Sequence, residues 1–366
     1  MRPSISKFRY MDPMLAVICL LLLLMGLTLI YSTSLTDGHG IFFKQLVFAA
    51  GGIFLFFFLA FFDFSTLTQI SRYFYVFLAV CLLAVLKFGH AVNGSARWFN
   101  LGFFSFQPAE FMKLVAVLVL GRFFTVRRGE IKDWRNIVLS FIYVLVPIAL
   151  IYKEPDLGSA AIIFLTWLGV LFLSNVEKKV FIYLFLLLTI FSVVSWTYVF
   201  KDYQRNRIET FINPERDPKG RGYNVQQAVI AVGSGGFSGS GLGRGLQSQL
   251  KFLPERQTDF IFASAAEELG FIGTTVILIL YLLLLYRLLV IYSQSRDDLS
   301  RFVIAGIFFM LFSQIVINIG MNVGILPVTG IPLPLISYGG SSLFTSAAAL
   351  GIAQAVAIRS KGLRLG

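Results

Sequence analysis

Residues 252–262 read Phe-Leu-Pro-Glu-Arg-Gln-Thr-Asp-Phe-Ile-Phe, so that Glu255, Arg256 and Asp259 run directly into apolar residues. They lie near the end of a polar, glycine-rich interval from Lys201 to Glu268, which contains nine of the chain's 31 Lys and Arg residues and eight of its 19 acidic residues. The rest of the chain consists mostly of long apolar runs. We therefore expect a membrane scaffold around one polar segment, and we expect the function to lie there.

The composition is that of a polytopic membrane protein. Of its 366 residues 57% are hydrophobic and 14% are charged, and the mean hydropathy is +0.79, whereas soluble domains carry about 25% charged residues. The 39 Phe residues indicate lipid-facing and packing surfaces, with a groove for a lipid tail as the alternative. We expect one integral membrane domain over residues 1–366, because membrane bundles of this size are commonly one cooperative unit.

The fold class follows from the length of the apolar runs, because a membrane-spanning helix needs roughly 20 apolar residues. The first run lacks a small-residue cleavage site, so we interpret it as an uncleaved span. The predicted fold is all-α, with about ten transmembrane helices. They are expected at residues 14–33, 41–62, 73–89, 108–126, 136–152, 158–174, 180–200, 269–291, 302–323 and 341–358.

Lys and Arg residues in short loops predict the orientation, because they are enriched on the cytoplasmic side. They gather in both terminal segments and in alternate short loops, with the largest cluster over residues 122–135. Both termini are then cytoplasmic, and residues 201–268 form a large outer loop between the seventh and eighth spans. The formal net charge of +12 partly reflects this bias, so it does not point to a nucleic-acid partner.

Three further polar clusters lie on the outer side in this topology, where ionisable groups beside spans are often functional. The first contains Arg97 and Trp98, followed by Glu110 and Lys113, which are neighbours on one helical face. For the latter pair the alternative is a helix start with an ion pair, and Arg97-Trp98 could be an interface anchor.

The second cluster is Lys153-Glu-Pro-Asp156, and the alternative to a functional site is an ordinary hairpin with Asp156 as an N-cap. The third runs from Asn322 to Ser342 and includes Ser337 and Ser341. Its prolines and glycines break helical structure at membrane depth, which is tolerated against protein or a watery cavity. We expect this segment to line a cavity.

The glycine-rich part of the opening interval, residues 233–245, contains seven glycines. Their spacing fits no phosphate-binding loop and no strand precedes them, so a nucleotide site is not expected. Glycines here allow close approach of the backbone to a ligand or to another helix. Residues 224–232 are expected to form a short helix in the membrane interface.

Cysteine and histidine do not indicate a metal site or a disulfide. Cys19 and Cys81 lie within apolar runs, where small packing residues are ordinary. His39 and His90 stand alone near predicted helix ends.

Asp259 is the strongest catalytic candidate. If a helix begins near Thr258, the carboxylate stands at its outer end beside apolar side chains. Burial would raise the pKa of Asp259 towards the working pH of a general base, and the charge of Arg256 would oppose that shift. The alternative is a helix-capping Asp259, with Glu267 and Glu268 as interface charges.

Three function classes remain open on these residues alone. An enzyme could bind a lipid-linked pyrophosphate with its basic groups while a carboxylate deprotonates a sugar hydroxyl. A transporter or lipid flippase would place charged or broken helices on both membrane faces, whereas these clusters gather on one. A membrane scaffold for partner proteins is the third class.

Several motifs resemble the SEDS family, named for shape, elongation, division and sporulation. They are Arg97-Trp98, Gln107-Pro-Ala-Glu110, Pro155-Asp156-Leu-Gly158, Gly233-Ser-Gly-Gly236, Leu253-Pro-Glu-Arg-Gln-Thr-Asp-Phe-Ile-Phe262, Ala266-Glu-Glu-Leu-Gly270 and Pro332-Leu-Pro-Leu-Ile-Ser-Tyr-Gly-Gly340. The likeness covers essentially the whole chain. Asp202-Tyr-Gln-Arg-Asn-Arg207 and Asn318-Ile-Gly-Met321 make it more similar to the elongation branch than to the division branch. Ala109 stands where the common family form has Ser.

The resemblance implies a ten-span, inverting peptidoglycan glycosyltransferase that polymerises lipid II outside the bacterial cytoplasmic membrane. It implies a class B penicillin-binding protein, a transpeptidase, as a partner within the cell-elongation machinery. Asp259 matches the family's essential carboxylate. The substrate-binding candidates are Arg97, Trp98, Glu110, Lys113, Asp156, Arg205, Arg207, Glu255, Ser337 and Ser341.

The resemblance leaves two points open. A divalent cation, Mg²⁺ or Mn²⁺, could assist the leaving pyrophosphate, for which Arg97, Lys113, Arg205 and Arg207 are the candidate protein ligands. A lipid II flippase, or a membrane scaffold for the penicillin-binding protein, is the alternative function.

Overall fold

The computed structural model describes residues 9–36, 38–92, 95–130, 133–174, 176–199, 205, 209–213, 217 and 220–365. In this part of the chain, ten helices coincide with the ten predicted spans. They are α2 (Pro13–Thr33), α3 (Gly40–Phe61), α4 (Phe64–Phe88), α5 (Pro108–Val126), α6 (Trp134–Lys153), α7 (Leu157–Leu173), α8 (Lys178–Val194), α12 (Ile261–Gln294), α13 (Asp298–Asn322) and α14 (Gly340–Leu365).

Within the described ranges, eight helices are long and apolar enough to cross a membrane. Helix α7 is apolar but has 17 residues, and α5 carries Glu110, Lys113 and Arg122 in its 19 residues. The prediction of an all-α polytopic membrane protein is confirmed at this level. The side of the membrane that each loop faces stays a prediction.

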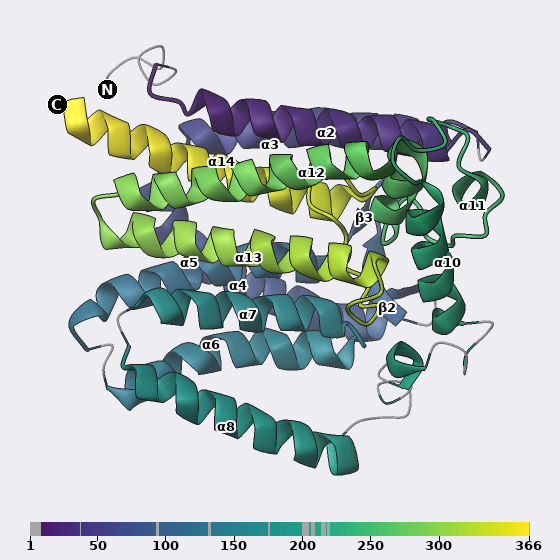
Figure 1. Cartoon of the computed structure of the whole chain (residues 1–366). Coiled ribbons are helices and arrows are strands. Elements are labelled where there is room, and N and C mark those ends of the chain that lie inside the picture. Colours follow the sequence, from purple (N-terminus) through teal and green to yellow (C-terminus); the bar gives the residue numbers. More distant parts are fainter. Residues whose placement is uncertain are drawn as a thin grey trace.

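The long helices run side by side in one bundle (Figure 1). Helix α14 packs against α3, and α13 packs against α5 and α7. Helix α8 lies at the edge of the bundle and exposes its apolar side chains. The beginning of α2 and the end of α14 lie at one end of the bundle, while the strands, α10 (Arg221–Ser234) and α11 (Leu246–Gln249) lie at the other. We call this second end, where α2 ends at Thr33 and α3 begins at Gly40, the cleft end.

Two short elements follow long helices of the bundle. The 3₁₀ helix η1 (Arg128–Glu130) follows α5, and the π-helical turn η2 (Ser195–Val199) follows α8. Helix α10 confirms the short helix expected at residues 224–232.

A small antiparallel sheet, which the sequence did not predict, lies between α4 and α5. It consists of β1 (His90–Val92), β2 (Ser95–Asn100) and β3 (Ser105–Phe106), in the order β1-β2-β3. Phe99 pairs with Phe106 across the second ladder. Gly102 closes the turn with a φ of 83°, and its amide donates to the Asn100 side chain at 2.9 Å. This sheet brings Arg97 and Trp98 to the cleft end.

The glycine-rich segment packs backbone to backbone against the beginning of α12. A Cβ atom added at Gly235 would lie 1.9 Å from the Ala266 carbonyl oxygen. Gly270, with a φ of 66°, forms a kink in α12, where an added Cβ would lie 2.2 Å from the Gly239 nitrogen. The amide of Ser240 donates to the Glu267 carbonyl at 3.0 Å. Of the two predicted uses of these glycines, close approach to another helix is the one observed.

Glu267 and Glu268 are buried, not interface charges. The Glu267 carboxylate accepts hydrogen bonds from the Gln247 and Ser248 amides at 2.7 and 3.0 Å, and so caps α11. The Glu268 carboxylate accepts from the Ser32 hydroxyl at 2.5 Å and from the Gln249 side chain at 3.3 Å. The two acids therefore connect α2, α11 and α12, because a buried carboxylate needs such donors.

Candidate active site

A cleft of about 430 Å³ lies at the cleft end of the bundle. Its lining residues come from α3, from the small sheet, from the loop before α12 and from the loop before α14. They are Lys44, Phe48, Trp98, Asn100, Gly102, Phe103, Ser105, Gln107, Thr258, Asp259, Gly330, Pro332, Tyr338, Gly339, Gly340, Ser341 and Ser342. The cleft thus unites the opening segment with the first and the last of the predicted polar clusters.

The backbone around Asp259 is fixed by side chains from α13. The Asn318 and Asn322 side-chain amides both donate to the Asp259 carbonyl oxygen at 3.0 Å. Asn322 also accepts from the Ala263 amide at 2.9 Å, in the first turn of α12. These bonds satisfy backbone groups that a helix start leaves unpaired, and they hold the backbone of Asp259 in place.

The loop before α14 supports Asp259 from the other side. The Ser337 hydroxyl donates to the Thr258 carbonyl at 2.6 Å, and the Tyr338 amide donates to the Gln257 carbonyl at 2.8 Å. A Cβ added at Gly330 would lie 3.4 Å from the Asp259 Oδ2 atom. Residues 323–339 contain no long helix and line the cleft through Gly330, Pro332 and others, as the sequence predicted.

The Asp259 carboxylate is partly exposed to the cleft and has no hydrogen-bond partner among the described residues. The pKa of Asp259 is raised to about 7, mainly by burial and in smaller part by the charge of Glu255, while the charge of Arg97 lowers it. Arg256 does not face Asp259: its guanidinium donates to the Thr33 carbonyl at 3.3 Å, at the end of α2. The sequence left open whether the pKa of Asp259 is raised or lowered, and in the structure it is raised.

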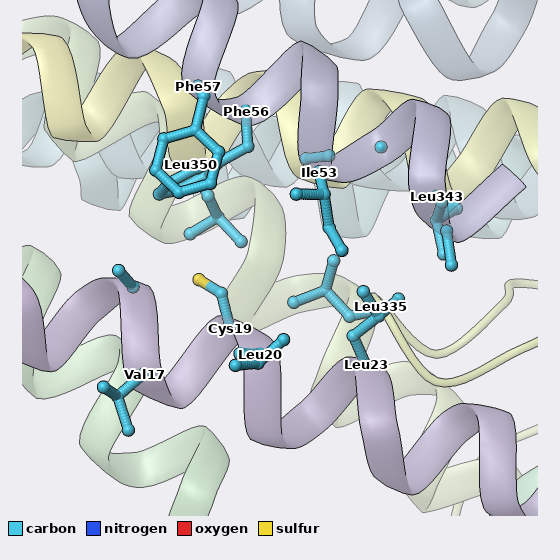
Figure 2. A pocket seen from close by; sticks show the side chains of 14 residues that line it. Val17, Cys19, Leu20, Leu23, Ile53, Phe56, Phe57, Leu335, Leu343 and Leu350 are labelled. Atoms are coloured by element: carbon cyan, nitrogen blue, oxygen red, sulfur yellow. The ribbon is translucent and has the colours of Figure 1, made fainter. Parts of the chain in front are cut away.

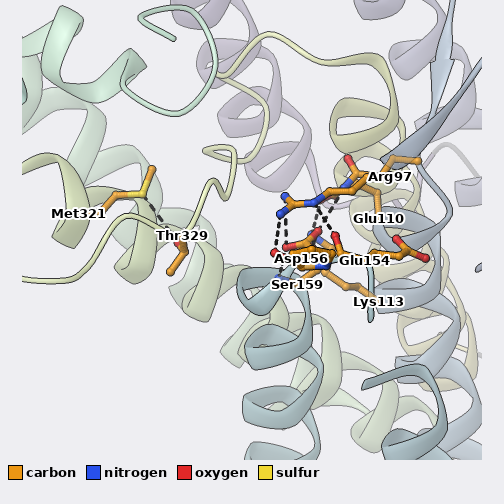
Figure 3. Close-up of polar contacts among 10 residues, drawn as sticks. Arg97, Glu110, Lys113, Glu154, Asp156, Ser159, Met321 and Thr329 are labelled. Atoms are coloured by element: carbon orange, nitrogen blue, oxygen red, sulfur yellow. Dashed lines mark hydrogen bonds and ion pairs between the residues drawn. The ribbon is translucent and has the colours of Figure 1, made fainter. Parts of the chain in front are cut away.

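Arg97 organises the polar cluster beside the cleft (Figure 3). Its guanidinium donates to the Glu154 and Pro155 carbonyl oxygens at 3.0 and 2.5 Å and lies 3.9 Å from the Asp156 carboxylate. Asp156 in turn caps α7 through the Ser159 amide at 3.1 Å. Asp156 therefore both caps α7 and belongs to the charged cluster around Arg97. The two interpretations of this turn do not exclude each other.

Glu154 belongs to this cluster, although the sequence presented it only as part of a charged turn. Its side chain is buried, and neither carboxylate oxygen has a hydrogen-bond partner among the described residues. The pKa of Glu154 is raised to about 8, mainly by burial and in smaller part by the charge of Asp156, while the charge of Arg97 lowers it. Glu154 is therefore mostly protonated at pH 7, which makes it a neutral acid next to an ion pair.

Glu110 and Lys113 form a buried ion pair at the beginning of α5, with the Lys113 Nζ atom 2.7 Å from the Glu110 Oε1 atom. Neither residue lines the cleft. The Glu110 Oε2 atom has no hydrogen-bond partner in the described part of the chain. Gln107, at the N-cap of the same helix, connects this region to the cluster by donating to the Asp156 carboxylate at 3.3 Å.

The structure therefore brings most of the predicted site residues to one end of the bundle. Asp259, Trp98 and Ser341 line the cleft, and Ser341 also accepts from the Gln107 amide at 3.0 Å. Glu255 lies on the exposed surface of the loop before α12 and bonds Thr258 at 3.0 Å. Arg205 donates to the Thr197 carbonyl at 3.0 Å and does not line the cleft. Arg207 lies outside the described residues.

Several polar lining residues were not among the predicted site residues, namely Lys44, Asn100, Ser105, Gln107, Thr258, Tyr338 and Ser342. In the sequence, Lys44 is a single lysine near the beginning of an apolar run, and Tyr338 is part of the motif that ends at Gly340. A metal site is not formed by the described residues: no three His, Cys, Asp or Glu side chains converge on one point. We therefore derive no step through a divalent cation.

The fold and the cleft define a class: an all-α, multi-pass membrane protein with a carboxylate-bearing polar cleft at one end of its bundle. Residues 13–362 match the cell cycle protein family of FtsW, RodA and SpoVE. The chain belongs to this family, which is the SEDS family that its motifs resemble.

Individual relatives agree with this assignment. The peptidoglycan glycosyltransferase MrdB of Escherichia coli K12 is 37% identical over 354 residues, covering 97% of this chain and 95% of MrdB. The rod shape determining protein RodA of Thermus thermophilus superposes with a TM-score of 0.71 and 28% identity, over 95% of this chain and 96% of that chain. A chain from a peptidoglycan synthase complex that coordinates polymerization and crosslinking has a TM-score of 0.83 and 30% identity, over 96% and 98% of the two chains.

Proposed function

We propose that the chain is a peptidoglycan glycosyltransferase that polymerises lipid II into β-1,4 glycan strands during cell elongation. The reaction would take place on the outer face of the bacterial cytoplasmic membrane, which places the cleft end outside. The observation that carries the proposal is the Asp259 carboxylate: it opens into the cleft without a hydrogen-bond partner among the described residues, and its pKa is raised to about 7. A general base works best with a pKa near the operating pH.

In this mechanism Asp259 accepts the proton from the 4-hydroxyl group of the acceptor GlcNAc. The hydroxyl oxygen attacks C1 of the donor MurNAc, the bond from C1 to the pyrophosphate oxygen breaks, and the lipid pyrophosphate leaves with the electron pair. Attack opposite the leaving group inverts the α-linkage to a β-1,4 bond. Because pyrophosphate is a good leaving group, one carboxylate suffices, unlike the two-carboxylate arrangement of glycoside hydrolysis.

An apolar pocket of about 210 Å³ supports a lipid-linked substrate (Figure 2). It lies between α2, α3 and α14, and its lining side chains are almost all aliphatic or aromatic; Cys19 is the exception in Figure 2. Burial of apolar surface contributes roughly 25 cal/mol per Å², so such a surface favours a hydrocarbon chain. We propose that it takes part of a polyprenyl chain.

We propose a class B penicillin-binding protein as the partner. The similar chain of TM-score 0.83 comes from a complex that couples polymerization to crosslinking, and a transpeptidase performs crosslinking. A lipid II flippase remains the second candidate for the isolated chain.

Reconstitution with lipid II separates the two candidates. The purified protein, alone and with its partner transpeptidase, is incubated with lipid II and the glycan products are resolved by length on a gel. Lipid II translocation is measured in parallel, in vesicles that contain the same protein. We expect glycan polymer, whose formation does not require translocation. Translocation without any polymer, in the presence of the partner, would reject the glycosyltransferase and favour the flippase.

The pH dependence of polymerisation should report Asp259. Since the base must be deprotonated and burial raises its pKa to about 7, kcat/KM is expected to rise with pH to a plateau above this value. Below it, the rate should fall about tenfold per pH unit. The measurement is the initial polymerisation rate from pH 5 to 9 at subsaturating lipid II.

The variant Glu255→Gln tests whether the fall in kcat/KM at low pH is due to protonation of Asp259. Glu255 contributes to the raised pKa of Asp259 through its negative charge, so its removal should move the midpoint to lower pH. A midpoint that stays in place or moves upward would contradict the assignment of this fall to Asp259.

A further inference from the structure

One stripe along α3 connects the cleft to the apolar pocket. Lys44 and Phe48 line the cleft, and Gly52 and Phe56 line the apolar pocket. These four residues follow one another at intervals of four, and residues so spaced are neighbours on a helix surface, so the four form one continuous row that winds slowly around α3. Along this row the lining therefore changes from a cation to an aromatic ring and then to a purely apolar surface.

Lys44 is the one Lys or Arg residue of the described chain that lines the cleft. Its side chain is exposed, and its ammonium group makes no hydrogen bond or ion pair with the described residues. The other cations of this region are already engaged. Arg97 binds two carbonyl oxygens beside Asp156, and Lys113 is buried against Glu110.

We propose that Lys44 binds the pyrophosphate of the lipid-linked donor, with the polyprenyl chain running along α3 into the apolar pocket. This inference rests on the proposed function. The reacting C1 atom is bonded directly to the leaving pyrophosphate, so the phosphates must lie in the same cleft as the base. Lys44 and Asp259 share that cleft, and the order of cation and apolar surface along α3 matches the order of phosphate and hydrocarbon in the donor.

The chemistry of this role is electrostatic. Negative charge develops on the bridging oxygen as the bond to C1 breaks, and a positioned cation stabilises it in the transition state. Lysine acts as a compact point charge with three donors, which suits a phosphate group that approaches from an open cleft. Lys44 would therefore contribute to substrate binding and to leaving-group departure.

The test compares Lys44→Ala, Lys44→Arg and Lys87→Ala in the full chain with its partner present. Loss of a hydrogen bond between charged groups corresponds to about a 10- to 100-fold effect, so Lys44→Ala should lose about that factor in kcat/KM. Lys44→Arg keeps the charge and should stay within a few-fold of wild type. Lys87 is a matched control, because it lies at the end of α4 that faces the cleft end of the bundle. It is exposed and stacks on Phe88, and it does not line the cleft.

Inhibition distinguishes phosphate binding from a structural effect. Polyprenyl pyrophosphate and the uncharged polyprenol are added as inhibitors of polymerisation by each variant. Lys44→Ala should weaken inhibition by the pyrophosphate about 10- to 100-fold and leave inhibition by polyprenol unchanged. Equal weakening of both would assign Lys44 to the shape of the pocket and overturn the proposal.

The two proposals fail in different ways. If the wild-type protein polymerises lipid II and Lys44→Ala does so at the same rate, the assignment of Lys44 is wrong while the proposed function stands. If the wild type makes no polymer with its partner, the proposed function itself fails. Should Lys44→Ala fold poorly, Lys44→Gln replaces it in both assays, with thermal denaturation as the check of folding.

Discussion

Replacing Asp259 with Asn is expected to lower the rate of lipid II polymerisation by about 10²- to 10⁴-fold, the range that a general base contributes. Asn has nearly the same shape and cannot accept the proton of the attacking hydroxyl. The contacts that position residue 259 involve its carbonyl oxygen, which accepts from Asn318 and Asn322, so the substitution leaves them intact. The measurement is the polymerisation rate of purified protein in complex with its partner.

The pH profile of Asp259→Asn makes this prediction specific. Residual activity should no longer fall below pH 7, because the group that titrates is gone. Asp133→Asn is a matched control: Asp133 is exposed, caps α6 by accepting from the Arg135 amide at 3.0 Å, and Asn is an equally good N-cap. It should leave rate and folding unchanged. An Asp259→Asn protein that folds normally and polymerises at more than a tenth of the wild-type rate would exclude the carboxylate as base.

The helices were predictable because the hydropathy and the length of an apolar run are properties of the local sequence. The structure differs from the predicted spans only in where the helices begin and end. Helix α4 shows the reason for the displacement. The apolar run predicts residues 73–89, but the helix begins at Phe64, where Asp63 caps it by accepting from the Thr66 amide at 2.9 Å. A polar first turn can be helical when an N-cap satisfies its amides, and a hydropathy window does not detect this.

The small sheet was not predictable for a related reason. Its strands have 3, 6 and 2 residues, too short for an alternating pattern to stand out between two spans. The sheet nevertheless decides where Arg97 lies. The pairing of Arg97 with the turn before α7 joins segments far apart in the chain, and local sequence patterns contain no information on such contacts.

Within the site, Asp259 was predicted because it lies in a distinctive local motif, whereas Lys44 lies in no such motif and was not predicted. Asp259 stands among charged and apolar neighbours that no ordinary span contains. Lys44 is a single lysine near a helix end, and only the three-dimensional cleft distinguishes it from Lys87. For Glu267 and Glu268 the structure excludes the alternative of interface charges. The amides of α11 and the Ser32 hydroxyl make the burial of these two acids possible, and the local sequence does not show these donors.

Replacing Lys113 with Met is expected to destabilise the protein by about 3–5 kcal/mol, the usual cost of leaving one partner of a buried ion pair behind. Both side chains are almost fully buried, at 0% and 3% exposure, so the remaining Glu110 carboxylate could not turn to solvent. Its Oε2 atom already lacks a partner among the described residues. The measurement is thermal denaturation in detergent, with Lys87→Met as an exposed control that should not change the midpoint.

The double variant Glu110→Leu with Lys113→Met separates the cost of the unpaired charge from the value of the pair. Replacing a whole buried ion pair by apolar residues of similar volume is often neutral or stabilising, so the double variant should recover most of the lost stability. If it is no more stable than Lys113→Met, an uncompensated Glu110 is not the cause. Because neither residue lines the cleft, its polymerisation rate should fall less than that of Asp259→Asn, and the size of that fall measures what the pair contributes to the site once folding is restored.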